Sequence, residues 1–149
     1  MADPDAPGPG ASLPDGIARL TAAARGLSQL LKAILAEDGL REDQWRVMDA
    51  LAHTHGLLMG ELARTLVLPP ATTTRCVDEL TDLGLVFRRP QPEDARKFVV
   101  YLSRTGYERY DRALSLLEAH RAELTELLGG ACSHDLLRAA APPPAPMPR

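Results

Sequence analysis

The sequence predicts a mainly α-helical fold with one small β-hairpin. Three observations lead to this prediction. Long apolar stripes with helical spacing lie near both ends of the chain, and two short helical patterns meet at a tight turn in the middle. Directly after these patterns the apolar period changes to that of strands. We therefore expect a winged helix-turn-helix domain, a small β-hairpin wing included, combined with terminal dimerisation helices.

The composition allows one folded domain and argues against several classes of protein. The chain has 149 residues, of which 45% are apolar and 4% aromatic, so its core must consist mainly of Leu, Val and Ala. No apolar run is long enough to span a bilayer and no secretory signal pattern is visible, so we expect a soluble, cytoplasmic protein without a membrane partner. A Gly-rich phosphate loop, a nucleophile elbow and well-spaced paired carboxylates are all missing, which argues against an enzyme and against a cofactor.

Composition and periodicity together divide the chain. Residues 1–14 and 142–149 are rich in Pro and have little to bury, so they are expected to be a disordered arm and a disordered tail. Residues 15–141 form the single expected domain. Within it, residues 15–38 and 103–141 are expected to be dimerisation helices, and residues 42–102 the winged helix-turn-helix.

Two long helices are expected to carry the apolar stripes. The first runs from Asp15, a candidate N-cap, to Gly39, a candidate stop, and the second starts after Ser103, is interrupted on its stripe by Arg121, and ends at Gly129. A short last helix is expected at about residues 132–141. The two stripes comprise Ile17, Leu20, Ala24, Leu27, Leu31 and Ile34, and Tyr107, Tyr110, Leu114, Leu117, Leu124 and Leu128. A plain intramolecular core would explain them, but the middle of the chain is too small to cover both, which favours a homodimer.

The middle of the chain contains three shorter helical patterns, over residues 42–54, 60–66 and 70–83. The last two are joined by the short turn Val67-Leu68-Pro69, which is the spacing of a helix-turn-helix. Gly84 ends the third pattern, and β-branched and aromatic runs at 85–89 and 98–102 then flank a polar loop at 90–95. These runs predict the hairpin.

The net charge of −3 hides an uneven distribution along the chain. Residues 64–104 carry seven basic and five acidic side chains, whereas the segments on either side are acidic. Positive charge is therefore concentrated on the expected second helix and hairpin, which favours double-stranded DNA as the partner.

The helix at 70–83 is the candidate recognition helix. On a helical wheel its buried face is centred on Leu80, and Thr74 and Arg75 lie opposite, with Thr72 at the flank. Thr binds phosphate or contacts a thymine methyl, and Arg binds guanine in bidentate fashion, so these three residues are the expected major-groove contacts. Asp78 and Asp82 share the outer face, and we expect an Arg to neutralise at least one of them, from among Arg75, Arg88 and Arg89.

The hairpin carries the other expected contacts. Arg96 near the tip is suited to a narrow minor groove, and Asp94, two residues earlier, is expected to orient it. Arg88 and Lys97 add positive charge to the same hairpin and complete the set of expected DNA-binding residues. A solvated charged turn is the alternative interpretation of this loop.

These residues resemble the MarR family of bacterial transcriptional regulators. The similar stretches are DQWRVMDAL, GELARTL, PPATTTRCVDELTDLGLVFR and PEDARKFVVYLSRTG, which occur in family order over about residues 43–106. The resemblance implies a triangular homodimer whose two winged lobes bind successive major grooves of an inverted-repeat operator. It also implies repression that a small phenolic or other aromatic effector releases. Two positions depart from the family pattern: Pro69 stands where Ser is common, and Ala95 where Arg is common.

Other functions stay open at this stage. A winged helix used only for protein–protein contact is one, although it would not need an Arg at the wing tip. A metal-sensing variant would have to bring together His53, His55, His120, Glu37 and Asp38, and a redox-sensing variant would use Cys76. The sequence does not identify the effector, the operator, the regulated genes or the sign of regulation.

Overall fold

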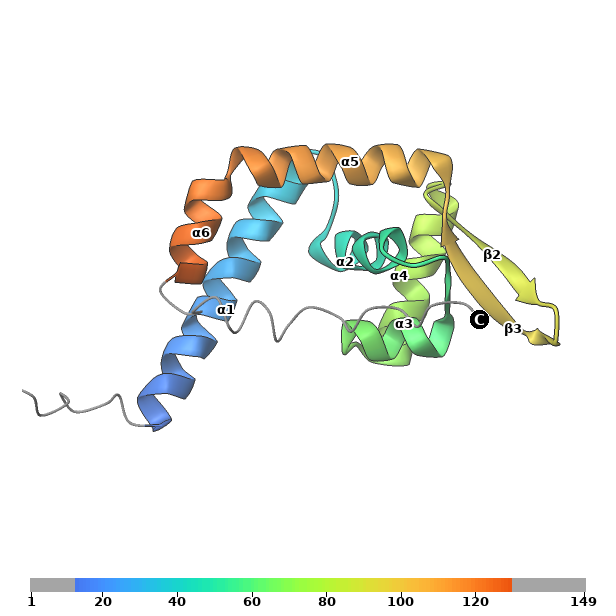
Figure 1. The fold of residues 1–149 in the computed structure, drawn as a ribbon, viewed down its shortest axis with the longest axis horizontal. Coiled ribbons are helices and arrows are strands. Elements are labelled where there is room, and N and C mark those ends of the chain that lie inside the picture. Colours follow the sequence, from blue (N-terminus) through green and yellow to red (C-terminus); the bar gives the residue numbers. More distant parts are fainter. Residues whose placement is uncertain (1–12, 130–149) are drawn as a thin grey trace, which may run out of the picture.

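The computed structural model describes residues 13–129. The expected short helix at 132–141, the tail at 142–149 and most of the arm lie outside this range. The elements are α1 (Leu13–Ala36), α2 (Glu42–Ala52), β1 (Leu57–Leu58), α3 (Met59–Leu66), α4 (Pro70–Asp82), β2 (Val86–Gln91), β3 (Asp94–Leu102), α5 (Arg104–Ala119) and α6 (Arg121–Gly129). In Figure 1, α5 lies across the top of the molecule, with α1 and α6 at one end and the β2–β3 hairpin at the other.

Helix α1 starts earlier than expected but ends as expected. It begins at Leu13, so Asp15 lies inside the first turn and the prediction of an Asp15 N-cap is wrong. Pro14 suits this early position because its missing N–H would have no helical partner there. At the other end, Gly39 has a φ of +65°, and the Leu40 N–H donates to Leu35 O at 3.0 Å. This is a Schellman termination, for which glycine is favoured.

The turn of the helix-turn-helix has the same backbone geometry without a glycine. Val67 has a φ of +53°, and the Leu68 N–H donates to Ala63 O at 3.1 Å. A β-branched residue in this left-handed conformation is strained, because its Cβ approaches the carbonyl oxygen. The Val67 side chain is 86% exposed, so no packing compensates for the strain within the described residues.

The hairpin is longer than expected and belongs to a three-stranded sheet. Strands β2 and β3 pair as antiparallel neighbours up to Gln91 and Asp94, so they extend into the predicted loop at 90–95. The register is irregular after Pro90, which has no N–H to donate. Strand β1, which the sequence did not predict, pairs with β3 through Leu57 and Val100, giving the order β1-β3-β2.

The expected second long helix is two helices. Helix α5 ends at Ala119 with His120 as its C-cap, and α6 turns away from it in Figure 1. The prediction of one helix from 103 to 129 is therefore wrong. The His120 N–H is shared between Leu116 O at 3.3 Å and Leu117 O at 3.2 Å, as is common at a helix end, and the ring Nδ1 also lies 3.0 Å from Leu116 O. Helix α6 then packs on α1, where Leu127 lies close to Gly26.

The hydrophobic core lies inside the winged lobe, which we define as residues 40–102. Most of its buried side chains come from α2, α3, α4 and the sheet, and Leu35 of α1 and Tyr110 and Ala113 of α5 complete it. The predicted stripe of α1 is divided: Ile34 is 1% exposed, but Ile17 is 59% and Leu20 51% exposed. The N-terminal part of α1 therefore presents apolar side chains that residues 13–129 leave exposed.

Candidate nucleic-acid interface

Helix α4 begins with two prolines and presents a small polar face. Pro69 is the N-cap residue and has no side-chain cap, while Thr73, which is fully buried, donates through its N–H to Pro69 O at 3.0 Å. Thr74 is exposed and its hydroxyl donates to Pro70 O at 2.9 Å, and Thr72 is half-buried. These hydroxyls donate to carbonyl oxygens, so they do not replace a capping Ser, whose oxygen would accept from a free backbone N–H of the first turn.

Arg75 lies on the outer face of α4, as predicted. Its side chain is 69% exposed, and Nε lies 4.0 Å from Glu79 Oε1, one turn further along the helix. Glu79 in turn accepts a hydrogen bond from Arg41 Nη2 at 2.6 Å. The sequence indicated neither Arg41 nor Glu79, because residues so far apart in the chain give no local pattern.

Arg88 neutralises Asp78, one of the two outer acids on the recognition helix. Arg88 Nη2 donates to Asp78 Oδ1 at 2.6 Å, and the Arg88 side chain is only 29% exposed. The prediction that an Arg neutralises an outer acid is thus confirmed. The pair also ties β2 to α4, so the hairpin and the recognition helix are held together beside the same face.

The wing tip shows the predicted contact between Asp94 and Arg96. Asp94 Oδ1 accepts hydrogen bonds from the Arg96 backbone N–H at 3.1 Å and from Arg96 Nε at 3.2 Å. The Arg96 side chain is nevertheless 92% exposed, and Lys97 Nζ lies 4.0 Å from the other Asp94 oxygen. Asp94 therefore orients Arg96 without burying it.

Aromatic stacking supports the base of the wing. The rings of Phe87 and Tyr101 stack with centroids 5.3 Å apart, and the Arg89 guanidinium lies 5.2 Å from the Phe87 centroid. Gly56, at a φ of +98°, packs against Tyr101 so closely that a Cβ there would lie 2.5 Å from the ring. The hairpin is thus a fixed element on the lobe.

The start of α5 is bonded to the base of the hairpin. Ser103 caps α5 by accepting from the Gly106 N–H at 2.9 Å, and its hydroxyl donates to Gly84 O at 2.7 Å. A Cβ at Gly106 would lie 2.0 Å from Leu85 O, so only glycine fits this position. This contact is the physical reason for the Leu-Ser-x-x-Gly pattern seen in the sequence.

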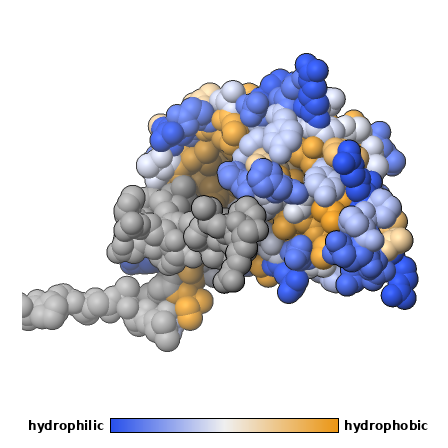
Figure 2. Space-filling model, turned by 45° about the vertical axis from the view of Figure 1, so that its right-hand side comes forward, coloured by the Kyte–Doolittle hydropathy of each residue, from blue (hydrophilic) through white to orange (hydrophobic). Residues whose placement is uncertain are grey.

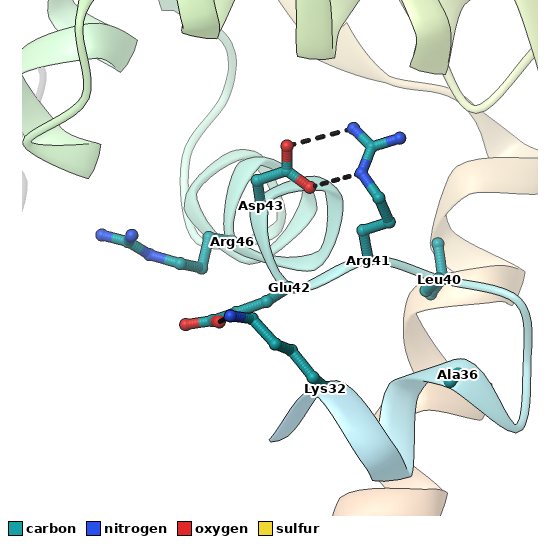
Figure 3. Close-up of a pocket in the computed structure, with 7 residues that line it drawn as sticks. All are labelled: Lys32, Ala36, Leu40, Arg41, Glu42, Asp43 and Arg46. Atoms are coloured by element: carbon teal, nitrogen blue, oxygen red, sulfur yellow. Dashed lines mark hydrogen bonds and ion pairs between the residues drawn. The ribbon is translucent and has the colours of Figure 1, made fainter. Parts of the chain in front are cut away.

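A hollow of about 490 Å³ lies between α1 and the start of α2. Figure 3 shows that Arg41 and Asp43 face one another above it, that Lys32 and Glu42 meet across it, and that Arg46 points away. Ala36 and Leu40 contribute its apolar part. Three cationic and two acidic side chains line it, so the lining carries a small positive excess.

The structure bears on the metal-sensing and redox-sensing variants and on membrane-spanning helices. Within residues 13–129 no group of three or more His, Cys, Asp or Glu side chains is placed to hold a metal ion. Cys76 is fully buried, and this burial raises the pKa of its thiol to about 12, which disfavours the reactive thiolate. None of the described helices is long and apolar enough to cross a membrane.

Helices α3 and α4 with their tight turn, followed directly by a hairpin, define a winged helix-turn-helix protein. A family model described as the MarR family matches residues 38–97. An HTH-type transcriptional regulator of Mycobacterium bovis is 30% identical over 122 residues, which are 82% of this chain and 85% of the relative. A regulator of the same type from Mycobacterium tuberculosis gives the same values. The chain belongs to the MarR family of transcriptional regulators, as its sequence motifs indicated.

Solved structures show the same fold. The transcriptional repressor CouR, bound to a 23-mer DNA duplex, is 28% identical with a TM-score of 0.71, covering 80% of this chain and 85% of CouR. The Mycobacterium tuberculosis regulator MosR in complex with DNA is 26% identical with a TM-score of 0.65, covering 80% and 84%. Apo MarR from E. coli, at 22% identity, has a TM-score of 0.67 and covers 80% and 86%. The predicted fold class is confirmed.

Proposed function

We propose that this regulator is a homodimeric repressor that binds an inverted-repeat operator in double-stranded DNA, and that a small aromatic or phenolic effector releases it. The observation that supports this most is the pairing of two exposed arginines on linked elements. Arg75 on α4 is 69% exposed and Arg96 on the wing is 92% exposed, while the Arg88–Asp78 pair joins the two elements. Because its proposed target is genomic DNA, we expect the protein to be located in the bacterial cytoplasm.

The proposed contacts follow from the exposed groups. Thr72, Thr74 and Arg75 contact the major groove, where Arg binds guanine O6 and N7 in bidentate fashion. Arg96 enters the minor groove, Asp94 orients it, and Lys97 contacts phosphate. Arg88 supports the interface by removing the charge of Asp78, which would otherwise repel the DNA backbone.

The proposed dimer rests on apolar surface that the single chain leaves open. On α5 the side chains of Tyr107 and Leu114 are 43% and 40% exposed, in addition to Ile17 and Leu20 of α1. Figure 2 shows orange apolar surface exposed on one face of the molecule. Apolar side chains on two terminal helices fit a second copy of the chain. A two-fold dimer then prefers half-sites with centres about 10 base pairs apart.

The effector is proposed to bind near the hollow between α1 and α2. Its volume of about 490 Å³ is within the usual size of a small-molecule site. Leu40 and Ala36 offer apolar contact to an aromatic ring, and the charged side chains around them offer hydrogen bonds to a phenolic hydroxyl.

Binding titrations against the protein's own promoter region, at several salt concentrations, test the proposed function. Arg75→Ala should weaken operator binding roughly ten- to a hundredfold and relax preference at one base pair. Arg96→Ala should weaken binding to most duplexes and lower the salt slope by about one unit for a lost phosphate contact. If both folded variants bind as the wild type does, the DNA surface is misplaced and a protein–protein interaction module becomes the better explanation.

A further inference from the structure

Glu79 connects the recognition helix to Arg41, which lies in the turn before α2. Its Oε2 atom accepts from Arg41 Nη2 at 2.6 Å and from Gln44 Nε2 at 3.5 Å. Its Oε1 atom lies 4.0 Å from Arg75 Nε. One carboxylate thus faces two arginines, one from the turn before α2 and one from the DNA-facing side of α4.

Arg41 is held in place independently of α4. Its guanidinium forms a bidentate pair with Asp43, with Nε and Nη2 both at 3.0 Å from the carboxylate oxygens, as Figure 3 shows. Its backbone N–H donates to Gln44 Oε1 at 3.1 Å. The hydrogen bonds that Arg41 donates to Asp43 and Glu79 raise its pKa above the usual value for arginine. Arg41 therefore brings a fixed positive charge to Glu79.

The distances indicate which arginine holds Glu79. At 2.6 Å the Arg41 contact is a short charge-assisted hydrogen bond, whereas the 4.0 Å contact of Arg75 is at the outer limit of an ion pair. An exposed ion pair one helical turn apart contributes little energy of its own. That energy rises if Glu79 loses its other cation, because the whole carboxylate charge then acts on Arg75.

We propose that Arg41 and Glu79 are positioning residues for Arg75. Arg41 forms the shorter ion pair with Glu79 and so leaves the Arg75 side chain free to reach a base edge. Without Arg41, the Glu79 carboxylate pairs with Arg75 and holds its side chain along the helix. This inference rests on the proposed DNA-binding function. Arg41 also lines the hollow between α1 and α2.

The test is a set of fluorescence anisotropy titrations of the full chain against its footprinted promoter site and against an unrelated duplex. Arg41→Gln should weaken promoter binding about three- to fivefold, the most that competition from one exposed ion pair can cost, and relax preference at the base pair that Arg75 recognises. Binding to the unrelated duplex should change by less than about twofold. Arg41→Lys, which keeps the charge, should recover part of the loss.

Coupling between the residues separates positioning from general charge or folding effects. In a Glu79→Gln background, Arg41→Gln should have less than about a twofold effect, because no carboxylate remains to capture Arg75. Glu79→Gln alone should bind the promoter as well as the wild type or a few-fold better, and any gain should vanish when Arg75 is Ala. Arg104→Gln is the matched control, since it also removes an arginine from an ion pair, with Glu108 on α5.

Two results would overturn the inference. One is an equal loss from Arg41→Gln with and without Glu79, and the other is an equal loss on both duplexes. If Arg41→Gln does not fold, as judged by circular dichroism, the Glu79→Gln comparison with and without Arg75 decides alone: a gain that persists without Arg75 refutes positioning. A wild-type chain that binds no duplex would instead refute the proposed function.

Discussion

The winged lobe and the terminal helices differ in how far each completes its own packing. In the lobe, Leu51, Leu62 and Leu80 are at most 1% exposed, and the hairpin is stacked, paired and capped. In α1, by contrast, the apolar side chains are buried only near the C-terminal end, and Ile17 and Leu20 stay open. The winged lobe thus buries its own apolar side chains, whereas the terminal helices expose apolar side chains that are available for association. Substitutions in the two regions should therefore have different consequences.

The largest effect is expected at the junction of the lobe with α5. Gly106→Ala places a methyl group 2.0 Å from Leu85 O, which belongs to the backbone and cannot move without disturbing the hairpin. We expect a loss of about 3 kcal/mol in the free energy of unfolding, measured by urea denaturation. Gly60→Ala is the control, because nothing lies within 4 Å of a Cβ there and alanine favours helix. Equal stability of Gly106→Ala and wild type would contradict this close approach.

The next effect separates association from folding. Leu20→Glu puts a charge on the open face of α1 and should raise the dimer dissociation constant by at least about tenfold, since burying one leucine contributes roughly 1.5–3 kcal/mol. Sedimentation equilibrium measures this shift. Leu83→Glu is the matched control: Leu83 is 60% exposed, against 51% for Leu20, but lies on the winged lobe. The proposed seam is wrong if Leu20→Glu associates as tightly as the control.

A smaller, stabilising effect is expected at the helix-turn-helix turn. Val67→Gly removes a strained side chain at a φ of +53° and should stabilise the lobe by about 1 kcal/mol, the strain relief exceeding the added chain entropy. Thermal unfolding would show this as a rise of a few degrees in Tm. Val67→Ala keeps a Cβ in the left-handed region and should gain less. A lower Tm for the glycine variant would mean that Val67 is not strained.

The smallest effect concerns Cys76. Because burial raises the pKa of its thiol from 9.0 to about 12, this cysteine stabilises the fold below pH 9, and the contribution is lost as the pH rises toward 12. Near neutral pH we therefore expect almost no reaction with a disulfide reagent until the chain unfolds, measured in a Cys132→Ser background. Rapid modification of the folded chain would revive the redox-sensing alternative.

Local patterns in the sequence predicted the elements that have local causes. Gly39 and Gly84 marked helix ends because a left-handed residue there favours glycine, and the wheel of residues 70–83 placed Cys76 inside and Arg75 outside. The contact between Asp94 and Arg96 spans two residues and was likewise predictable.

Features with distant causes were missed. Strand β1 has only two residues, so it has no period to detect, and it exists because β3 pairs with it. The break at His120 involves neither proline nor glycine, and it lets α6 pack on α1, which is distant in the sequence. Arg41 and Glu79 are far apart in the sequence, and only the fold brings their charges together.

The bonded junction between Ser103, Gly84 and Gly106 makes α5 a lever. A helix of 16 residues is about 24 Å long, so a tilt of about 10° at its far end would displace the near end by roughly 4 Å. The hairpin would move together with α5, because its base is hydrogen-bonded to the first turn of that helix. In a dimer, two such levers would set the separation of the wings, which must match the roughly 34 Å repeat of DNA. In such a dimer, a rotation of about 10° where the terminal helices meet would therefore shift each wing by roughly 4 Å relative to its groove.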